Sequence, residues 1–204
     1  MSKVSIIAAI TSMAMLAGCT TGQWQTSYND VVSSSDSRNW RVTEIDVRVP
    51  ETLTVSEENS FAPDADIVWR EEPRGDRYAQ VDRIITEAAQ RGSSGLRGNK
   101  PVKLVLVVDT FHALSEKART RLSRSGVHNI GFTAQVFDAR TGQALTPADQ
   151  VQADLVAYVG EQANAAVAQG QTQRVRIVRH VANTIAGWLA AGPDPRGVFS
   201  RRGR

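Results

Sequence analysis

Cysteine and histidine are scarce in this sequence: Cys19 is the only cysteine, and there are three histidines in 204 residues. A lone cysteine excludes an internal disulfide, so the stability of any folded domain has to come from packing. The formal net charge is +3, of which Lys3 contributes one unit, and so small a surplus gives no basis for a nucleic-acid-binding face. The sequence also lacks an internal repeat and an apolar run of the roughly 20 residues needed to span a bilayer.

A short apolar segment does lie near the N-terminus, and it leads to the cysteine. Lys3 precedes it, and the length of residues 4–16 suits a signal peptide. The motif Leu16-Ala17-Gly18-Cys19 resembles the lipobox of bacterial lipoprotein precursors. The resemblance implies cleavage before Cys19 and attachment of lipid to it, with acyl groups such as palmitate. An uncleaved membrane anchor and an ordinary secretory signal with an incidental cysteine are the alternatives.

The lipobox resemblance also implies a location. Several acyl chains on one residue anchor a protein far more firmly than a single chain does. Thr20 follows the cysteine, whereas Asp at this position is the inner-membrane retention signal of enterobacterial lipoproteins. We therefore expect a cell-envelope protein that is lipid-anchored with its domain in the periplasm, at the outer membrane rather than the inner one.

Composition divides the chain into four parts. They are a lipoprotein signal peptide at 1–18, a lipidated flexible tether at 19–39, a single globular α+β domain at 40–191 and a basic disordered tail at 192–204. The tether is predicted because Ser, Thr, Asn and Gln dominate that segment. Trp24 and Tyr28 interrupt its polarity, and they either dock on the domain or rest at the membrane interface.

Hydrophobic periodicity predicts the elements of the domain. Strands are expected over 40–49, 102–111, 127–138 and 151–159, and helices over 76–91 and 175–189. Asp76 is suited to cap the first helix, and an apolar stripe along the second requires it to pack on the sheet. Residues 115–123 form either a short exposed helix or a loop over the sheet.

The grouping of strands beside helices, without strict alternation, predicts an α+β fold. We expect a two-layer sandwich with a mainly antiparallel sheet and two helices on one face. Over residues 40–190 the chain is similar to small uncharacterised alphaproteobacterial lipoproteins, notably at 125–130 (SGVHNI) and 137–142 (FDARTG), and that family brings no known activity. The element order also resembles auxiliary lipoproteins of envelope transport systems, which is a fold-level analogy.

One grouping invites a test as a metal site. Asp109 ends a predicted central strand, His112 follows three residues later, and His128 begins the next predicted strand. A carboxylate and two imidazoles can bind a divalent metal. Residues i and i+3 of a strand point to opposite faces, however, which favours an exposed strand-end aspartate and two loop histidines. His180 flanks the buried stripe of the last helix and is expected to be structural.

Two segments look superficially like catalytic loops. Ser123-Arg124-Ser125-Gly126 lacks the Gly-x-Ser-x-Gly pattern of a nucleophile elbow. Residues 92–100 (GSSGLRGNK) follow a helix and precede a strand, the reverse of the order in a phosphate-binding loop. We therefore assign no catalytic residue, no metal ligand and no cofactor.

Arginines are concentrated near residue 200. The predicted tail contains four arginines and one acidic residue, Asp194; the arginines are Arg196, Arg201, Arg202 and Arg204. Arginine suits anionic lipid headgroups, polyanionic glycans or an acidic protein, although a charged tail that is simply solvated is the plainer interpretation.

These observations favour a non-enzymatic envelope lipoprotein that serves as an accessory or scaffold module. Its expected partners are the membrane, through the N-terminal lipid anchor, and another periplasmic or membrane protein, but not nucleic acid. One alternative is a metal-dependent periplasmic hydrolase that uses Asp109 and the histidines. The other is a carrier of a small apolar ligand such as lipid, which needs a cavity between sheet and helices.

Overall fold

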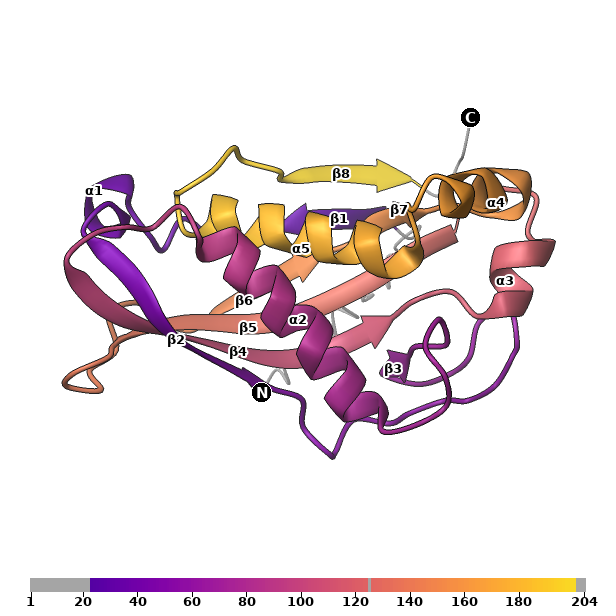
Figure 1. The fold of residues 1–204 in the computed structure, drawn as a ribbon, viewed down its shortest axis with the longest axis horizontal. Helices are drawn as coiled ribbons and strands as arrows, with labels where there is room; N and C mark the ends of the chain where they lie inside the picture. Colours follow the sequence, from indigo (N-terminus) through magenta and orange to yellow (C-terminus); the bar gives the residue numbers. More distant parts are fainter. Residues whose placement is uncertain (1–22, 125, 201–204) are drawn as a thin grey trace, which may run out of the picture.

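A mixed eight-stranded sheet and two long helices form the body of the protein (Figure 1). The computed structural model describes residues 23–124 and 126–200, so Cys19 and the predicted signal peptide lie outside the described residues. The elements in chain order are β1 (Gln23–Ser27), α1 (Ser34–Ser37), β2 (Trp40–Arg48), β3 (Ile67–Val68), α2 (Arg77–Ser93), β4 (Lys100–His112), α3 (Glu116–Arg121), β5 (Gly126–Asp138), β6 (Asp149–Ala153), β7 (Leu155–Ala157), α4 (Gly160–Ala168), α5 (Gln173–Trp188) and β8 (Gly197–Ser200).

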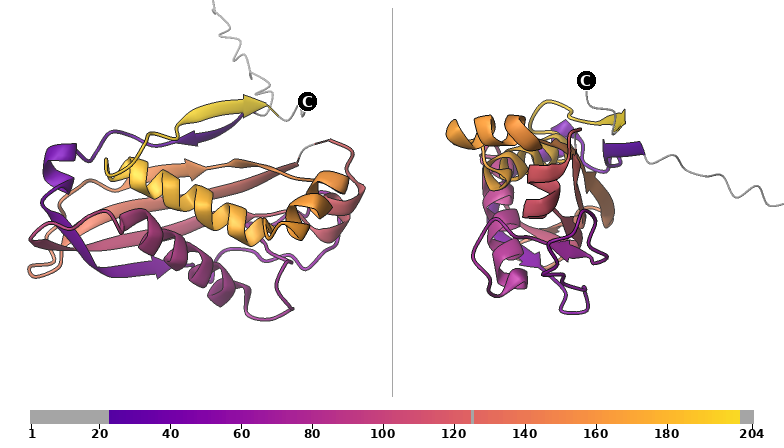
Figure 2. Two further views of the ribbon diagram at one scale, coloured as in Figure 1. Left: turned by 45° about the horizontal axis from the view of Figure 1, so that its top comes forward. Right: turned by 90° about the vertical axis from the view of Figure 1, so that its right-hand side faces the viewer.

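The strands follow the spatial order β2-β4-β5-β6-β1-β8, with β3 paired to β4 and β7 paired to β5. Most neighbours are antiparallel, and the exceptions are the parallel pairs β2 with β4 and β3 with β4. Helices α2 and α5 lie side by side on one face of the sheet, while α3 and α4 lie at one end of it (Figures 1 and 2). The predicted α+β sandwich with two helices on one face is confirmed.

Both long helices begin at side-chain caps. The carboxylate of Asp76 accepts a hydrogen bond from the amide of Ala79 at 3.0 Å, as predicted. Thr172 caps α5, and Glu71 accepts bonds from the amides of Gln173 and Arg174 at 2.9 and 2.7 Å. These acceptors satisfy first-turn amides that have no partner within the helix, and a carboxylate there also interacts favourably with the helix dipole.

Alternation along β4 separates the two faces of the sheet. Val102, Leu104 and Leu106 are fully buried in the core cluster, together with residues of α2 and α5 such as Ile84 and Ile185. The residues between them, which include Lys103 and Val107, project to the other face because successive side chains of a strand point in opposite directions. The predicted strand over 102–111 is therefore confirmed, with two extra residues at its start and one at its end.

The structure corrects the prediction of a flexible tether for the described part of residues 19–39. β1 pairs with β6 on one side and with β8 on the other. Tyr28 is buried, and its hydroxyl donates to Asp194 at 2.9 Å, so this aromatic docks on the domain. The polar composition misled the prediction because backbone pairing, rather than apolar side chains, holds this strand in the sheet.

The prediction of a disordered tail over 192–204 is likewise wrong for residues 192–200. β8 pairs with β1 from Gly197 to Ser200, although Val198 within it remains largely exposed. Arg196 fixes the approach to this strand, because its guanidinium pairs with Asp194 at 2.6 Å and with Asp30 at 2.9 Å. Residues 201–204 lie outside the described part of the chain.

The predicted strand over 151–159 is divided in two. Asp154 separates β6 from β7, and its carboxylate accepts bonds from the amides of Gln25 and Ile130 at 3.1 and 3.2 Å. After β7 the chain forms α4, a helix that the sequence analysis did not predict. Residues 115–123, left open between helix and loop, contain the short helix α3 with Ser115 as its N-cap.

Candidate functional site

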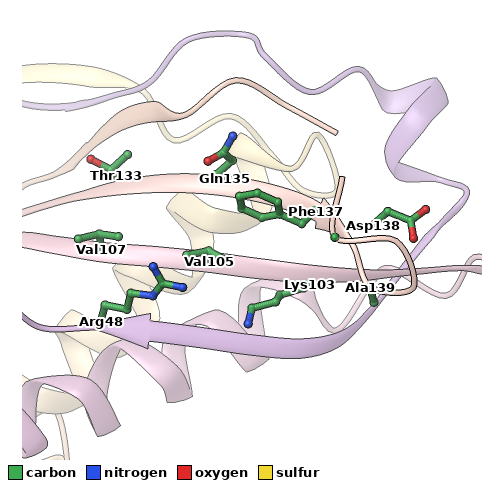
Figure 3. A pocket seen from close by; sticks show the side chains of 10 residues that line it. Arg48, Lys103, Val105, Val107, Thr133, Gln135, Phe137, Asp138 and Ala139 are labelled. Atoms are coloured by element: carbon green, nitrogen blue, oxygen red, sulfur yellow. The ribbon is translucent and has the colours of Figure 1, made fainter. Parts of the chain in front are cut away.

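The face of the sheet opposite α2 and α5 carries a groove of about 370 Å³. Its apolar floor consists of Val105 and Val107 on β4 and Phe137 on β5 (Figure 3). The register places Lys103 beside Phe137, Val105 beside Gln135 and Val107 beside Thr133. The remaining lining residues are Arg48, Asp138, Ala139 and Gly142.

Charges at the rim of the groove are paired. Lys103 Nζ lies 2.6 Å from Glu44 Oε1 and 3.0 Å from Asp46 Oδ2, and Arg48 Nη2 lies 2.8 Å from the same oxygen of Asp46. Hydrogen bonds from Arg48 and Lys103 lower the pKa of Asp46 below its usual range. Because carboxylates neutralise both cations, the rim offers no isolated positive charge to an anionic ligand.

Polar side chains extend the same face beyond the groove. Thr133 Oγ1 donates to Gln150 Oε1 at 3.1 Å, and Gln150 Nε2 donates to Asp109 Oδ2 at 2.7 Å. The resulting surface has an apolar centre and a polar margin, an arrangement typical of protein-binding surfaces. The sequence analysis missed it, although the outward residues of the strands at 102–111 and 127–138 include the apolar Val105, Val107 and Phe137.

Asp109, His112 and His128 do not converge. Asp109 lies at a bulge of β4 and accepts the bond from Gln150, whereas His112 Nε2 lies 2.9 Å from the carbonyl oxygen of Pro63. His128 is completely buried within the domain. Residues 23–124 and 126–200 contain no group of three His, Cys, Asp or Glu side chains placed to hold a metal ion. Both histidines lie in strands, so the expectation of loop histidines is also wrong.

His128 and His180 belong to the interior around α5. Burial lowers the pKa of His128 to about 3, and the nearby charge of Arg176 acts in the same direction. Neither ring nitrogen of His128 has a hydrogen-bond partner among the described residues. His180 Nε2 lies 3.0 Å from Thr26 Oγ1, which links α5 to β1. This contact fits the structural role expected for His180.

The segments 123–126 and 92–100, which superficially resemble catalytic loops, are both connections between a helix and the strand that follows it. Ser123 and Arg124 are exposed in the connection between α3 and β5, while Ser125 lies outside the described residues. Gly98, in the segment 92–100, donates its amide hydrogen to the carbonyl oxygen of Trp40 at 2.7 Å. This segment connects α2 to β4 and holds the beginning of β2.

Large side chains occupy the space between the sheet and the helices. Leu106, Phe132 and Ile177 are each completely buried there. A lipid bound between the two layers would have to displace such residues, so the carrier hypothesis gains no support from this region. Among the described residues, no helix has both the length and the apolar character needed to cross a bilayer.

Comparisons with known proteins give the following matches. A candidate lipoprotein from Caulobacter crescentus is 20% identical over 53% of this chain and 83% of its own, with a TM-score of 0.35. A single-substitution variant of the PelC dodecamer from Paraburkholderia phytofirmans is 10% identical over 83% of this chain and 98% of its own, also with a TM-score of 0.35. A comparison with curated proteins finds no match.

A protein-family model matches the chain from β2 to its last residue. It matches residues 40–204, from the first residue of β2 onward, and its description is a family of unknown function, DUF6778. Because the match includes well over half of the sequence, the chain belongs to the DUF6778 family.

Proposed function

We propose that this protein is a non-enzymatic, lipid-anchored module of the cell envelope that binds another envelope protein through the uncovered face of its sheet. The observation that carries the proposal is the groove over Val105, Val107 and Phe137, on the face opposite α2 and α5. Apolar side chains grouped on an otherwise polar surface are typical of protein-binding sites.

The groove also indicates the chemistry of the partner. Its floor is apolar, and Lys103 and Arg48 are already paired with carboxylates. A charged partner segment would therefore gain little at the rim. We infer a partner that inserts an uncharged, apolar side chain and offers hydrogen-bonding groups to Thr133 and Gln135 at the edge.

Attachment to the membrane supports this function by confinement. The lipobox at Leu16-Ala17-Gly18-Cys19 supports the anchor, and Thr20 favours the outer membrane with the domain in the periplasm. A tethered domain meets membrane-associated partners at a raised effective concentration, so even a groove of modest size can sustain binding.

Site-specific photocrosslinking in the native envelope tests this proposal. A benzophenone amino acid at position 133 samples the groove, and one at position 90, on the exposed side of α2, provides the matched control. We expect one defined crosslinked protein from position 133, none from position 90, and loss of the product in Phe137→Lys. Equal crosslinking from both positions, or none from position 133, would contradict the proposal.

The anchor is tested separately by Cys19→Ser. We expect this variant to lose its lipid and with it the crosslink, because the domain is no longer confined to the membrane. If the crosslink persists in Cys19→Ser, the domain binds its partner without the lipid anchor. Partner binding would then stand, and the claim that it requires the anchor would be wrong.

A further inference from the structure

A small pocket lies where α3, α4 and the beginning of α5 meet (Figure 1). Its volume is about 10 Å³, which is enough for one group the size of a water molecule. Ala163, Ala166 and Val167 of α4 form an apolar wall, and the exposed side chain of Val167 places the pocket at the surface of the domain. The other lining residues carry polar groups, and none of them is acidic: Arg119, Tyr158, Gln171, Gln173 and Arg176.

Arg176 lines the pocket with an unpaired positive charge. Its guanidinium carbon lies 3.5 Å from the ring centroid of Tyr158, and its Nη2 donates to the carbonyl oxygen of Val156 at 2.6 Å. No carboxylate of residues 23–124 and 126–200 forms an ion pair with this guanidinium. Other buried or half-buried arginines of the domain each pair with a carboxylate, and these are Arg70, Arg77 and Arg174.

The surroundings of Arg176 disfavour its charge. Burial lowers the pKa of its guanidinium, and the nearby charge of Arg179 acts in the same direction. Burial also lowers the pKa of His128 and of His180, and the charge of Arg176 adds to that effect. Asp154 opposes the effect at His180, but among the described residues no carboxylate opposes it at Arg176. An anion in the pocket would offset this cost, because a buried charge is stabilised by a partner of opposite sign.

The lining residues retain hydrogen-bond donors that the fold leaves unused. A guanidinium group has five N–H donors, and Val156 accepts from only one nitrogen of Arg176. Arg119, on α3, donates to no acceptor among the described residues. Gln171 accepts from Arg179 through Oε1 at 2.8 Å, so its side-chain nitrogen keeps both N–H groups. These donors favour an anionic acceptor in the pocket.

Two carboxylates belong to the same helices, and neither occupies the pocket. Glu116, on α3, accepts a hydrogen bond from Arg70 Nε at 2.6 Å and is not part of the lining. Glu161, in the first turn of α4, is exposed and is not part of the lining either. An anion in the pocket would therefore meet two guanidinium groups and no carboxylate.

We propose that the pocket binds a carboxylate group carried on a short hydrocarbon stem. One carboxylate oxygen occupies the pocket and accepts hydrogen bonds from Arg176 and Arg119, since guanidinium groups form strong charge-assisted hydrogen bonds with carboxylates. The stem packs on Ala166 and Val167. Phosphate suits the site less, because the pocket admits a single oxygen and its wall is apolar. The carboxylate belongs either to a free short-chain acid or to another protein, and its site is separate from the groove of the proposed function.

Saturation-transfer NMR with butyrate tests the site. The purified full-length protein is titrated in detergent with butyrate and, as the matched uncharged ligand, with butyramide. Detergent without protein supplies the blank. We expect saturation transfer to the methyl group of butyrate, which packs on the wall formed by α4, and about tenfold tighter binding of butyrate than of butyramide. Equal binding of the two ligands would overturn the proposal.

Single substitutions identify the residues that bind the anion. Arg119→Gln and Arg176→Gln should each weaken butyrate binding by about tenfold, because each removes a charged donor. Arg140→Gln, in an exposed turn, is the control and should bind butyrate as the parent does. Arg119 makes no side-chain hydrogen bond among the described residues, so Arg119→Gln should unfold at the parent's temperature and decides the outcome even where Arg176→Gln lowers stability. Unchanged binding in Arg119→Gln would overturn the proposal.

Competition with short peptides distinguishes the two sources of the carboxylate. One peptide is blocked at both ends and carries a single glutamate, and its partner carries glutamine instead. Displacement of butyrate by the glutamate peptide alone would assign the site to a carboxylate of another protein. Displacement by neither peptide would assign it to a free acid, and equal displacement by both would contradict recognition of the charge.

Discussion

The indole Nε1 of Trp188 donates a hydrogen bond to Oδ2 of Asp149 at 3.0 Å, inside the domain. The same carboxylate accepts the amide hydrogen of Asn29 at 3.0 Å, and a second bond comes from the side chain of Asn29. Asp149 is 3% exposed. One buried carboxylate thus joins α5, β6 and the chain that follows β1.

Replacement of Asp149 by alanine should destabilise the domain. The change leaves the Trp188 and Asn29 donors without their acceptor in a buried position, and we expect the free energy of unfolding to fall by about 3 kcal/mol. Urea unfolding followed by tryptophan fluorescence measures the loss. Asp109→Ala is the control, because Asp109 makes one exposed hydrogen bond, and a change below about 0.5 kcal/mol is expected there. Equal losses in the two variants would contradict the role assigned to Asp149.

Stability should decrease in acid because of His128. Its pKa is about 3 in the folded domain and 6.5 for the ordinary side chain, so the unfolded chain binds more protons below pH 6.5. The contribution is fully present above pH 6.5, is lost progressively as the pH falls towards 3, and amounts to about 2.5 kcal/mol between pH 7 and pH 4.5. Urea unfolding at several pH values measures this slope.

His128→Leu provides the matched control for that slope. Leucine fills similar space without a titrating group and without ring nitrogens that lack partners. We expect its stability at pH 7 to equal or exceed that of the parent and its decline towards pH 4.5 to be shallower. His180, whose pKa burial also lowers, remains in both proteins and cancels in the comparison. Identical slopes would show that His128 does not determine the acid sensitivity.

Gly98 should not tolerate a side chain. A Cβ atom at this position would overlap the backbone carbonyl group of Asn39, whereas a Cβ atom at Gly95 would have its nearest neighbour at 3.9 Å. We expect Gly98→Ala to lower the free energy of unfolding by about 1–3 kcal/mol, because backbone has to move, and Gly95→Ala to change it by less than about 0.5 kcal/mol. Thermal unfolding of the pair checks the difference. A tolerated Gly98→Ala would mean that the contact with Asn39 relaxes readily.

Arg196 should control the order of β8. Besides its ion pairs with Asp194 and Asp30, its guanidinium carbon lies 4.6 Å from the ring centroid of Tyr28. We expect Arg196→Ala to accelerate amide hydrogen exchange in residues 197–200 and at the edge of β1 that faces them, with no change in β4 or β5. Arg140→Ala, in an exposed turn, is the control. Unchanged exchange in β8 would show that backbone pairing alone retains the strand.

The fold class could be predicted because the buried residues recur along the sequence with the periods of strands and helices. The alternation along β4 and the stripe of Val178, Val181 and Ile185 on α5 follow from one rule, which is that apolar side chains leave water. Asp76 was recognisable as a cap because its chemistry acts three residues away. Such features depend on neighbours in the chain, so the sequence alone reveals them.

The first and last strands were not predictable in this way. β1 contains Gln, Thr and Ser, and it becomes a strand because β6 and β8 supply hydrogen-bonding partners more than 120 residues away. The metal hypothesis failed for a related reason. Asp109 and His128 project into different surroundings once β4 and β5 pair, and spacing along the chain cannot reveal which surroundings these are.

The sequence by itself determined the lipobox resemblance, the long elements and the α+β class, since each depends on residue type and local spacing. Tertiary structure decided which face of the sheet the helices leave open, that Val105 and Phe137 line a groove there, and that Gln23 pairs with Ser200. These properties follow from strand order and register. They arise from the joint burial and backbone pairing of distant segments, which no local pattern encodes.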